Sequence, residues 1–522
     1  MSGRHAGFIV FALWLFTCAT RVVASQPQAR TEQGVLEGIE ANGVAVFRGV
    51  PFAASPVGDL RWRAPQPASS WRGVRKADNF SPVCMQEGSY PEDAPPERSS
   101  EDCLYLNVWA PHGARKRPVM VWIYGGGLRN GSASTPLYSG DRLARHDVVV
   151  VTFNYRLGVF GFLAHPDLTR ESPTHSSGSY GLEDQIAALR WVKRNIAAFG
   201  GDPDRITVFG QSSGAISISV LAASPLAKGL FQRAIAQSGG LFEPMQLLPE
   251  LSLSGAEQVG LKFATDAGAA DIVSLRAKPA EELLKRSFRH NLIVDGHVLT
   301  RPPYDTFLSG EQNDIAVLVG ANRDEGELFI RGQTVTAANF RAELERGLPA
   351  FLIDLIGVPR AVASDADAHA LVAAFNRDVR FGWDMWAWAR LASRKSRNVF
   401  AYQFSRTPPP GSPFAGLGAT HGAEMPYVFD HLDLQPLPWP DADRRLAAAM
   451  ATYWTNFAKT GDPNGVAGSG SAGLPAWPAF TEANPQGLLL GDEVRAGRPF
   501  DEQALTRIDS AYARVRASAA RK

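Results

Sequence analysis

Residues 205–215 carry the feature that most restricts the fold of this chain. A β-branched and aromatic run at 205–209 leads directly into Gly210-Gln211-Ser212-Ser213-Gly214, and small apolar residues follow. This order predicts a strand, a sharp turn and a helix, with the serine hydroxyl exposed above the edge of a sheet. The two glycines are expected because a side chain would clash in so tight a crossing. Ser212 is therefore a candidate nucleophile, although in a chain with 49 glycines the pattern alone also fits an ordinary turn.

Short apolar runs alternate with helical patterns along the chain. Strands are predicted at 118–124, 148–153, 205–209, 233–236, 315–319 and 399–404, and helices at 182–199 and 442–459. Strands that are apolar almost throughout are typical of a sheet covered by helices on both faces, and the alternation indicates an α/β fold with a mostly parallel sheet. Residues 25–522 are predicted to form a single domain with large insertions, among them a Gly/Ala/Ser-rich surface loop at 465–473.

The first 24 residues have the composition of a secretory signal peptide. Arg4 and His5 precede an apolar run at 8–16, and small residues end at Ala24, after which cleavage is expected. The sequence therefore predicts a secreted or periplasmic protein, with a lipoprotein signal ending at Cys18 as the alternative. No other run is apolar and long enough to span a bilayer. The net charge of +1 indicates no nucleic-acid partner.

The three cysteines agree with export. Cys18 lies in the predicted signal, which leaves Cys84 and Cys103 as an even pair in an oxidising compartment. A bond between them would close the loop 85–102 and stabilise the fold by roughly 3 kcal/mol in the chain-entropy model. Two free, buried thiols are the alternative.

A glycine run supplies candidate donors for the oxyanion that a serine nucleophile forms. Gly125, Gly126 and Gly127 follow the strand predicted at 118–124, and glycines let backbone N–H groups approach a substrate oxygen closely. The N–H of Ser213, next to the nucleophile, is the third candidate donor. The alternative is a plain glycine-rich loop.

The base and the acid are expected downstream of the serine. Histidines lie there at 290, 297, 369, 421 and 431, and only His421 is flanked by glycine and small residues that suit a tight loop. The acid candidate is Glu325, at the end of the strand predicted at 315–319, and its neighbour Asp324 is the competing candidate. An ordinary core or surface histidine and a solvated carboxylate are the alternatives.

Ordered sequence blocks extend this pattern along most of the chain. They lie at 47–53, 56–62, 101–107, 154–163, 181–192, 199–203 and 461–464. With them, the chain from about residue 34 to 480 resembles a type-B carboxylesterase of the cholinesterase-like family, which has an α/β-hydrolase fold. Because many blocks occur in order, this resemblance is far more specific than the serine pattern alone.

The resemblance implies a catalytic triad, an oxyanion hole, a residue that supports the triad and a disulfide. The triad would be Ser212, Glu325 and His421, with Glu325 rather than Asp324 as the acid. The oxyanion donors would be Gly126, Gly127 and Ser213, the supporting residue Ser238, and the disulfide Cys84–Cys103. A small-molecule ester is the implied substrate, and no metal or cofactor is expected.

Several positions depart from the family pattern. Gln211 stands where Glu usually precedes the nucleophile, Tyr124 replaces a His, Leu128 an aromatic residue and Ser213 an Ala. Cholinesterases carry a Trp in the first disulfide loop to stack a quaternary ammonium, whereas 85–102 contains no Trp. Neutral esters rather than choline esters are therefore expected as substrates.

The sequence thus predicts a serine carboxylesterase that works through an acyl-enzyme intermediate. The alternative is a catalytically inactive binding or adhesion protein on the same fold, because a fold does not fix a function. Trp383, Trp386 and Trp388 could line a gorge, but aromatic residues at helical spacing are more often part of a core.

Overall fold

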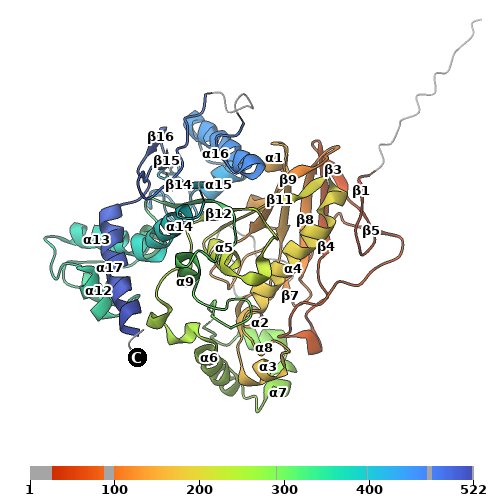
Figure 1. Cartoon of the computed structure of the whole chain (residues 1–522), viewed down its shortest axis with the longest axis horizontal. Coiled ribbons are helices and arrows are strands. Elements are labelled where there is room, and N and C mark those ends of the chain that lie inside the picture. Colours follow the sequence, from red (N-terminus) through yellow and green to blue (C-terminus); the bar gives the residue numbers. More distant parts are fainter. Residues whose placement is uncertain (1–25, 87–98, 290, 397, 467–472, 520–522) are drawn as a thin grey trace, which may run out of the picture.

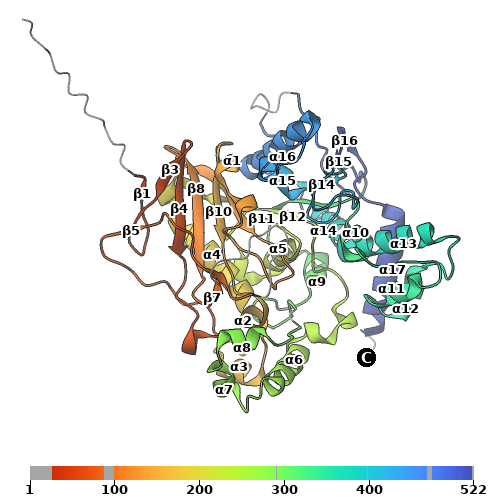
Figure 2. The same cartoon turned by 180° about the vertical axis from the view of Figure 1, so that it is seen from behind.

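A mixed sheet of eleven strands with helices around it forms the centre of the molecule (Figure 1 and, from behind, Figure 2). The structure is a computed structural model that describes residues 26–86, 99–289, 291–396, 398–466 and 473–519. The predicted signal peptide and most of the loop predicted at 465–473 lie outside these residues.

The strands of this sheet have the spatial order β16-β15-β14-β13-β12-β11-β9-β10-β8-β4-β3. A continuous parallel run makes up its centre: β10 (Val149–Phe153), β9 (Arg117–Ile123), β11 (Gly201–Gln211), β12 (Arg233–Gln237), β13 (Ala316–Asn322), β14 (Val399–Phe404) and β15 (Gly487–Leu490). Antiparallel strands flank it: β8 (Tyr105–Pro111), β4 (Val44–Pro51) and β3 (Ile39–Ala41) on one side and β16 (Val494–Gly497) on the other. The predicted mostly parallel sheet is confirmed.

The remaining elements are two small sheets and the helices. One sheet joins β1 (Gln28–Arg30), β2 (Val35–Glu37) and β5 (Val74–Lys76), and the other joins β6 (Val83–Cys84) and β7 (Ser99–Ser100). The α-helices are α1 (Asp141–Ala144), α2 (Gly158–Phe162), α3 (Pro166–Glu171), α4 (Tyr180–Asn195), α5 (Ser213–Ala223), α6 (Leu253–Asp266), α7 (Ile272–Arg276), α8 (Ala280–Leu284), α9 (Pro303–Leu308), α10 (Gly326–Phe329), α11 (Phe340–Glu345), α12 (Ala350–Ile356), α13 (Asp365–Arg377), α14 (Trp383–Ser393), α15 (Met425–Val428), α16 (Asp441–Thr460) and α17 (Glu502–Ala519).

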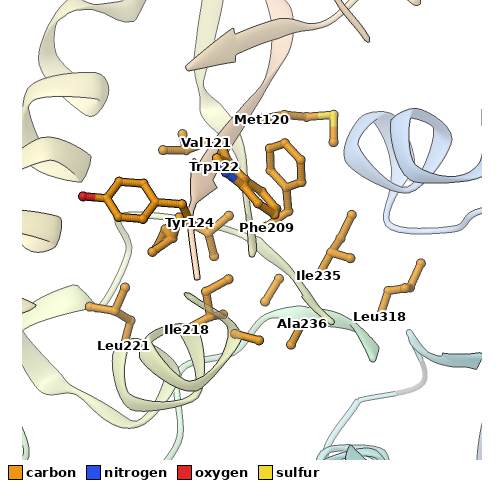
Figure 3. Packing of buried hydrophobic residues seen from close by; sticks show 14 of the residues in the cluster. Met120, Val121, Trp122, Tyr124, Phe209, Ile218, Leu221, Ile235, Ala236 and Leu318 are labelled. Carbon is orange, nitrogen blue, oxygen red and sulfur yellow. The ribbon is translucent and has the colours of Figure 1, made fainter. Parts of the chain in front are cut away.

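Side chains from both faces of the central strands are buried. Trp122 of β9 and Phe209 of β11 are register partners, so they share one face of the sheet, where both rings pack against Phe429 after α15. The opposite face receives α5: a Cβ atom at Gly210 would lie 3.1 Å from Ile218 of that helix. Figure 3 shows this arrangement, with Ile218 on the helix and the two rings among the strands. This coverage explains why β9 and β10 are apolar almost throughout.

Two predicted elements differ in their bounds. The strand predicted at 205–209 begins earlier, at Gly201, and its pairing with β9 is irregular between Gly201 and Ile206, so no continuous strand pattern marks that part of the sequence. The helix predicted at 182–199 is α-helical to Asn195 and ends in a 3-10 turn (Ile196–Phe199), after which Gly200 takes a left-handed φ of 80°. In the described part of the chain, no helix combines the length and the apolar character needed to cross a membrane.

Candidate active site

Ser212 lies on the sharp turn between β11 and α5. Its backbone has φ 56° and ψ −127°, a conformation that L-residues rarely adopt and that costs about 1–3 kcal/mol. Hydrogen bonds hold it there, because the Ser212 N–H donates to the Gln237 carbonyl (2.9 Å) and its own carbonyl accepts from the Ile216 N–H (2.9 Å). A Cβ atom at Gly210 or at Gly214 would lie 2.6 or 2.0 Å from the Ile123 carbonyl oxygen, so both positions need glycine.

Glu325 and His421 meet beyond the carboxyl ends of neighbouring strands. Glu325 follows β13, His421 lies in the loop after β14, and the distance from Glu325 Oε2 to His421 Nδ1 is 2.6 Å. Glu325 is fully buried, and its Oε1 accepts from the Ser238 hydroxyl (2.5 Å) and from the Asn322 N–H (2.7 Å). The Glu325 carboxyl group is therefore removed from water but has three hydrogen-bond donors.

Asp324, the competing candidate, has other partners. Its Oδ2 accepts from the Ala419 N–H at 2.8 Å, and its carboxylate pairs with the Arg323 guanidinium at 2.8 Å. Asp324 therefore binds the backbone of the loop that carries His421, whereas Glu325 contacts the imidazole ring itself. The other described downstream histidines have separate partners, which are Glu183 for His297, Glu327 for His369, and the Leu137 carbonyl for His431.

The second nitrogen of His421 contacts Gln211. The amide nitrogen of Gln211 lies 3.2 Å from His421 Nε2, on the ring nitrogen opposite to Glu325. With the amide as donor, Nδ1 carries the ring proton and Nε2 is an acceptor, which is the tautomer that a general base requires. The ring also stacks on Phe381, with centroids 4.4 Å apart at 13°, and packs against Phe329 at 5.6 Å. Sequence reasoning identified Gln211 as a departure from the family pattern. It missed the contact of Gln211 with His421 and the packing of the two phenylalanines on the ring.

The glycine run after β9 forms a left-handed loop next to the serine turn. Gly126, Gly127 and Leu128 have φ values of 103°, 62° and 61°. A Cβ atom at Gly126 would lie 2.1 Å from the Asn130 carbonyl oxygen, so only glycine fits there. The Leu128 N–H donates to the Ser213 hydroxyl at 3.2 Å, which ties this loop to the first residue of α5. The structure thus brings the glycine run and Ser213 together, and it adds a side-chain contact of Ser213 that the sequence did not reveal.

A second buried carboxyl group lies behind Glu325. Glu424 is fully buried and accepts hydrogen bonds from the side-chain amides of Gln237 (3.1 Å) and Asn322 (2.6 Å). Burial, followed by the charge of Glu325, raises the pKa of Glu424 above its usual range. Sequence reasoning missed Glu424, which lies three residues after His421.

Ser212, Gln211 and His421 line one cavity of about 240 Å³. Its other lining residues are Gly125, Gly126, Asn130, Gly131, Leu137, Tyr138, Leu328, Arg331, Pro413, Phe414, Gly422 and Met425. Trp383, Trp386 and Trp388 are buried in the core instead, so the core interpretation of these residues is the correct one. Within the described residues, no group of three or more His, Cys, Asp or Glu side chains is arranged to hold a metal ion.

A disulfide joins Cys84 and Cys103, whose Cα atoms are 5.0 Å apart. Two residues after Cys84, the Gln86 side chain accepts from the Gly131 N–H (2.9 Å) and donates to the Gly131 carbonyl (3.1 Å). Gly131 lines the cavity that contains Ser212. The Gln86 side chain therefore connects the segment next to the disulfide with Gly131, in the loop that follows the glycine run.

Comparisons with known proteins agree with this geometry. Residues 25–507 match the model of the "Carboxylesterase family". The chain is similar to the fumonisin B1 esterase of Sphingopyxis macrogoltabida, with 37% identity over 95% of this chain and 92% of that protein. It is also similar to the para-nitrobenzyl esterase of Bacillus subtilis (strain 168), with 35% identity over 89% and 94%.

A solved structure of a PNB esterase shares the fold. It superposes with a TM-score of 0.78 at 34% sequence identity, covering 92% of this chain and all of that one. The α/β-hydrolase fold that the sequence predicted is therefore confirmed. The chain belongs to the carboxylesterase family and is a carboxylic ester hydrolase.

Proposed function

We propose that this protein is a serine carboxylesterase in which Ser212 is the nucleophile, His421 the general base and Glu325 the group that orients the base. The observation that carries the proposal is the 2.6 Å contact between Glu325 Oε2 and His421 Nδ1, together with the shared cavity that His421 and Ser212 line. An accepting Nε2 suits the removal of the serine proton.

The reaction follows from these groups. Ser212 Oγ attacks the ester carbonyl while His421 Nε2 exchanges its contact with the Gln211 amide for one with the serine hydroxyl and takes the hydroxyl proton. The N–H groups of Gly126, Gly127 and Ser213 stabilise the oxyanion, and Ser238 positions Glu325 by its hydrogen bond. The imidazolium then protonates the leaving alcohol. Water attacks the acyl-enzyme by the same route and releases the acid.

Neutral esters are the proposed substrates in preference to choline esters. Gln211 puts a neutral amide where a carboxylate would attract a cationic alcohol group, and the described lining of the cavity contains no Asp or Glu. The proposal predicts that kcat/KM for butyrylcholine does not exceed that for its uncharged isostere, 3,3-dimethylbutyl butyrate. A preference of about tenfold or more for the cationic ester would contradict it, because this corresponds to about 1.4 kcal/mol of charge recognition.

Export is proposed from the residues that precede the described part of the chain. The signal peptide is taken as 1–24 and the mature protein as the single domain 25–522, secreted or periplasmic. A disulfide between Cys84 and Cys103 suits an oxidising compartment. Amino-terminal sequencing of exported protein should begin at Ser25; an amino-terminally lipidated Cys18 would support the lipoprotein alternative instead.

Replacement of the nucleophile tests the core of the proposal. Ser212→Ala should lower kcat for a 4-nitrophenyl ester by about 10⁴-fold or more, because only oxyanion and binding contributions remain. An organophosphate should label Ser212 in the unmodified protein, as shown by peptide mass mapping. Labelling of Ser213 or Ser238, or near-normal turnover by the variant, would overturn the assignment. A protein that neither turns over esters nor reacts with the label would support the inactive binding protein.

A further inference from the structure

Arg331 is a positively charged residue in the lining of the cavity that contains Ser212. It lies two residues after α10, the short helix that begins directly after Glu325, and it is exposed to solvent. Within the described residues, no carboxylate or carbonyl group is paired with its guanidinium, in contrast to Arg323, which pairs with Asp324 at 2.8 Å. An arginine that is free of internal partners has its planar set of donors available for a ligand.

The surroundings of Arg331 do not neutralise it. The described lining of the cavity contains no Asp or Glu, and Gln211, next to the nucleophile, is a neutral amide. Glu325 is fully buried behind His421, with all its contacts made to protein groups. A cleft with a charge of one sign and apolar walls concentrates ligands of the opposite sign. The walls here include Leu137, Leu328, Phe414 and Met425.

We infer that the site hydrolyses neutral esters but prefers, over neutral esters of the same shape, esters that carry a free carboxylate, which Arg331 binds while Ser212 attacks the ester group. This inference rests on the proposed serine esterase activity. The carboxylate and the scissile ester group belong to one small substrate, because Arg331 and Ser212 line the same cavity of about 240 Å³. The guanidinium fork matches a carboxylate with two parallel hydrogen bonds, which an amide or an alkyl group of the same size does not provide.

Two matched substrate pairs test the inference and distinguish the two sides of the ester. Mono-4-nitrophenyl adipate is compared with 4-nitrophenyl 5-carbamoylpentanoate, for a carboxylate on the acyl side. For the alcohol side, 4-acetoxybutanoate is compared with 4-acetoxybutanamide in a pH-stat, and uncatalysed rates are subtracted in both cases. In at least one pair, kcat/KM should favour the anion by roughly tenfold at low salt, the size expected for a charge-assisted hydrogen bond. High salt should reduce the preference, since the side chain is exposed.

Variants of Arg331 identify the source of the preference. Arg331→Gln should bring the anion-to-amide ratio close to one, and Arg331→Lys should leave an intermediate ratio because it keeps the charge without the fork. Arg115→Gln is the matched control: Arg115 is also exposed, but it precedes β9, at the end of the strand opposite to the glycine loop. The control should keep the full ratio.

The outcomes separate this inference from the activity on which it rests. Ratios near one in both pairs, or a preference that survives Arg331→Gln, would overturn the role of Arg331 while the esterase stands. If no ester is hydrolysed by the unmodified protein, or if hydrolysis does not depend on Ser212, both proposals fail together.

Discussion

Buried or half-buried carboxyl groups lie on both sides of the phenylalanines that flank His421, and their surroundings differ. On one side, Glu325 accepts three hydrogen bonds, from His421, Ser238 and the Asn322 N–H. On the other side, Glu243 and Asp384 line a second cavity of about 410 Å³, whose wall includes Phe329 and Phe381. Burial raises the pKa of both carboxyl groups there, and for Asp384 the neighbouring Glu243 adds to the effect.

The two sites differ in the hydrogen-bond donors that reach their carboxyl groups. Asp384 accepts from the Phe242 N–H, and within the described residues Glu243 Oε2 has no hydrogen-bond partner. With so few donors, the second pair favours protonation. Glu325 has donors to both oxygens, which suits the role proposed for it next to His421. The phenylalanine pair thus separates a carboxyl group that has three hydrogen-bond donors from two carboxyl groups whose pKa values are raised.

The largest effect is expected from replacement of the Glu325 carboxyl group, which contacts His421. Glu325→Gln should lower kcat for a 4-nitrophenyl ester by about 10⁴-fold, because an amide no longer holds the imidazole in the required tautomer or stabilises its protonated form. Thermal unfolding of the variant checks that it is folded. The neighbouring change Asp324→Asn is the control, since Asp324 contacts the loop and not the ring. A larger loss of kcat in Asp324→Asn than in Glu325→Gln would reverse the assignment.

A smaller effect is expected from removal of one donor to the same carboxylate. Ser238→Ala leaves Glu325 Oε1 with the Asn322 N–H alone, and we expect kcat to fall about 10- to 100-fold, by analogy with partners that orient a catalytic group. Ser238→Thr keeps the hydroxyl and should recover part of the loss. If Ser238→Ala changes the melting temperature but not kcat, the hydroxyl supports the fold only.

The carboxyl groups of Glu243 and Asp384 should lower the stability of the fold at high pH. A carboxyl group with a raised folded-state pKa binds its proton more tightly in the native protein, so its contribution to stability declines as the pH rises above its unfolded value. Asp384→Asn should therefore raise the melting temperature at pH 8 but change it little near the ordinary Asp pKa of 3.8. Asp314→Asn, at an exposed site, should leave the pH dependence unchanged. Equal destabilisation by Asp384→Asn at every pH would contradict the protonated pair.

The smallest effect concerns the amide that contacts His421 from the cavity side. Gln211→Glu puts a carboxylate about 3 Å from Nε2, which favours the protonated imidazole. The acidic limb of the kcat/KM profile should then move up by about one pH unit, and activity on choline esters should rise relative to neutral esters by a few-fold. Gln211→Met, which is similar in length and uncharged, should leave the limb in place. An unchanged limb in Gln211→Glu would show that the carboxylate turns away from the ring.

Local patterns predicted the candidate residues that lie on turns and strand ends. The serine turn follows from Gly210 and Gly214, and the glycine loop from its position after β9. Strands that are buried on both faces were recognisable because they are apolar at nearly every position. Such features depend on the backbone of a few consecutive residues, and a single sequence therefore contains them.

Contacts between distant segments were not predictable in the same way. Phe381 comes from the π-helical segment Asp378–Gly382, and nothing in its own neighbourhood indicates a stacked histidine. The contact of Gln211 with His421 and the burial of Glu424 depend on how the loop after β14 folds over β11 and β13. Arg331 likewise gains its significance from the absence of carboxylates in the described lining of the cavity, which only the assembled structure reveals.

The left-handed backbone at Ser212 has a consequence for how this protein can evolve. The strained turn lowers the free energy of unfolding, and the surrounding sheet and α5 compensate for it. Selection for thermal stability alone would favour glycine at this position, since glycine adopts such angles without steric conflict. A serine at this position, the proposed nucleophile, therefore favours activity at a cost in stability. The well-packed core around β9 and β11 offsets this cost.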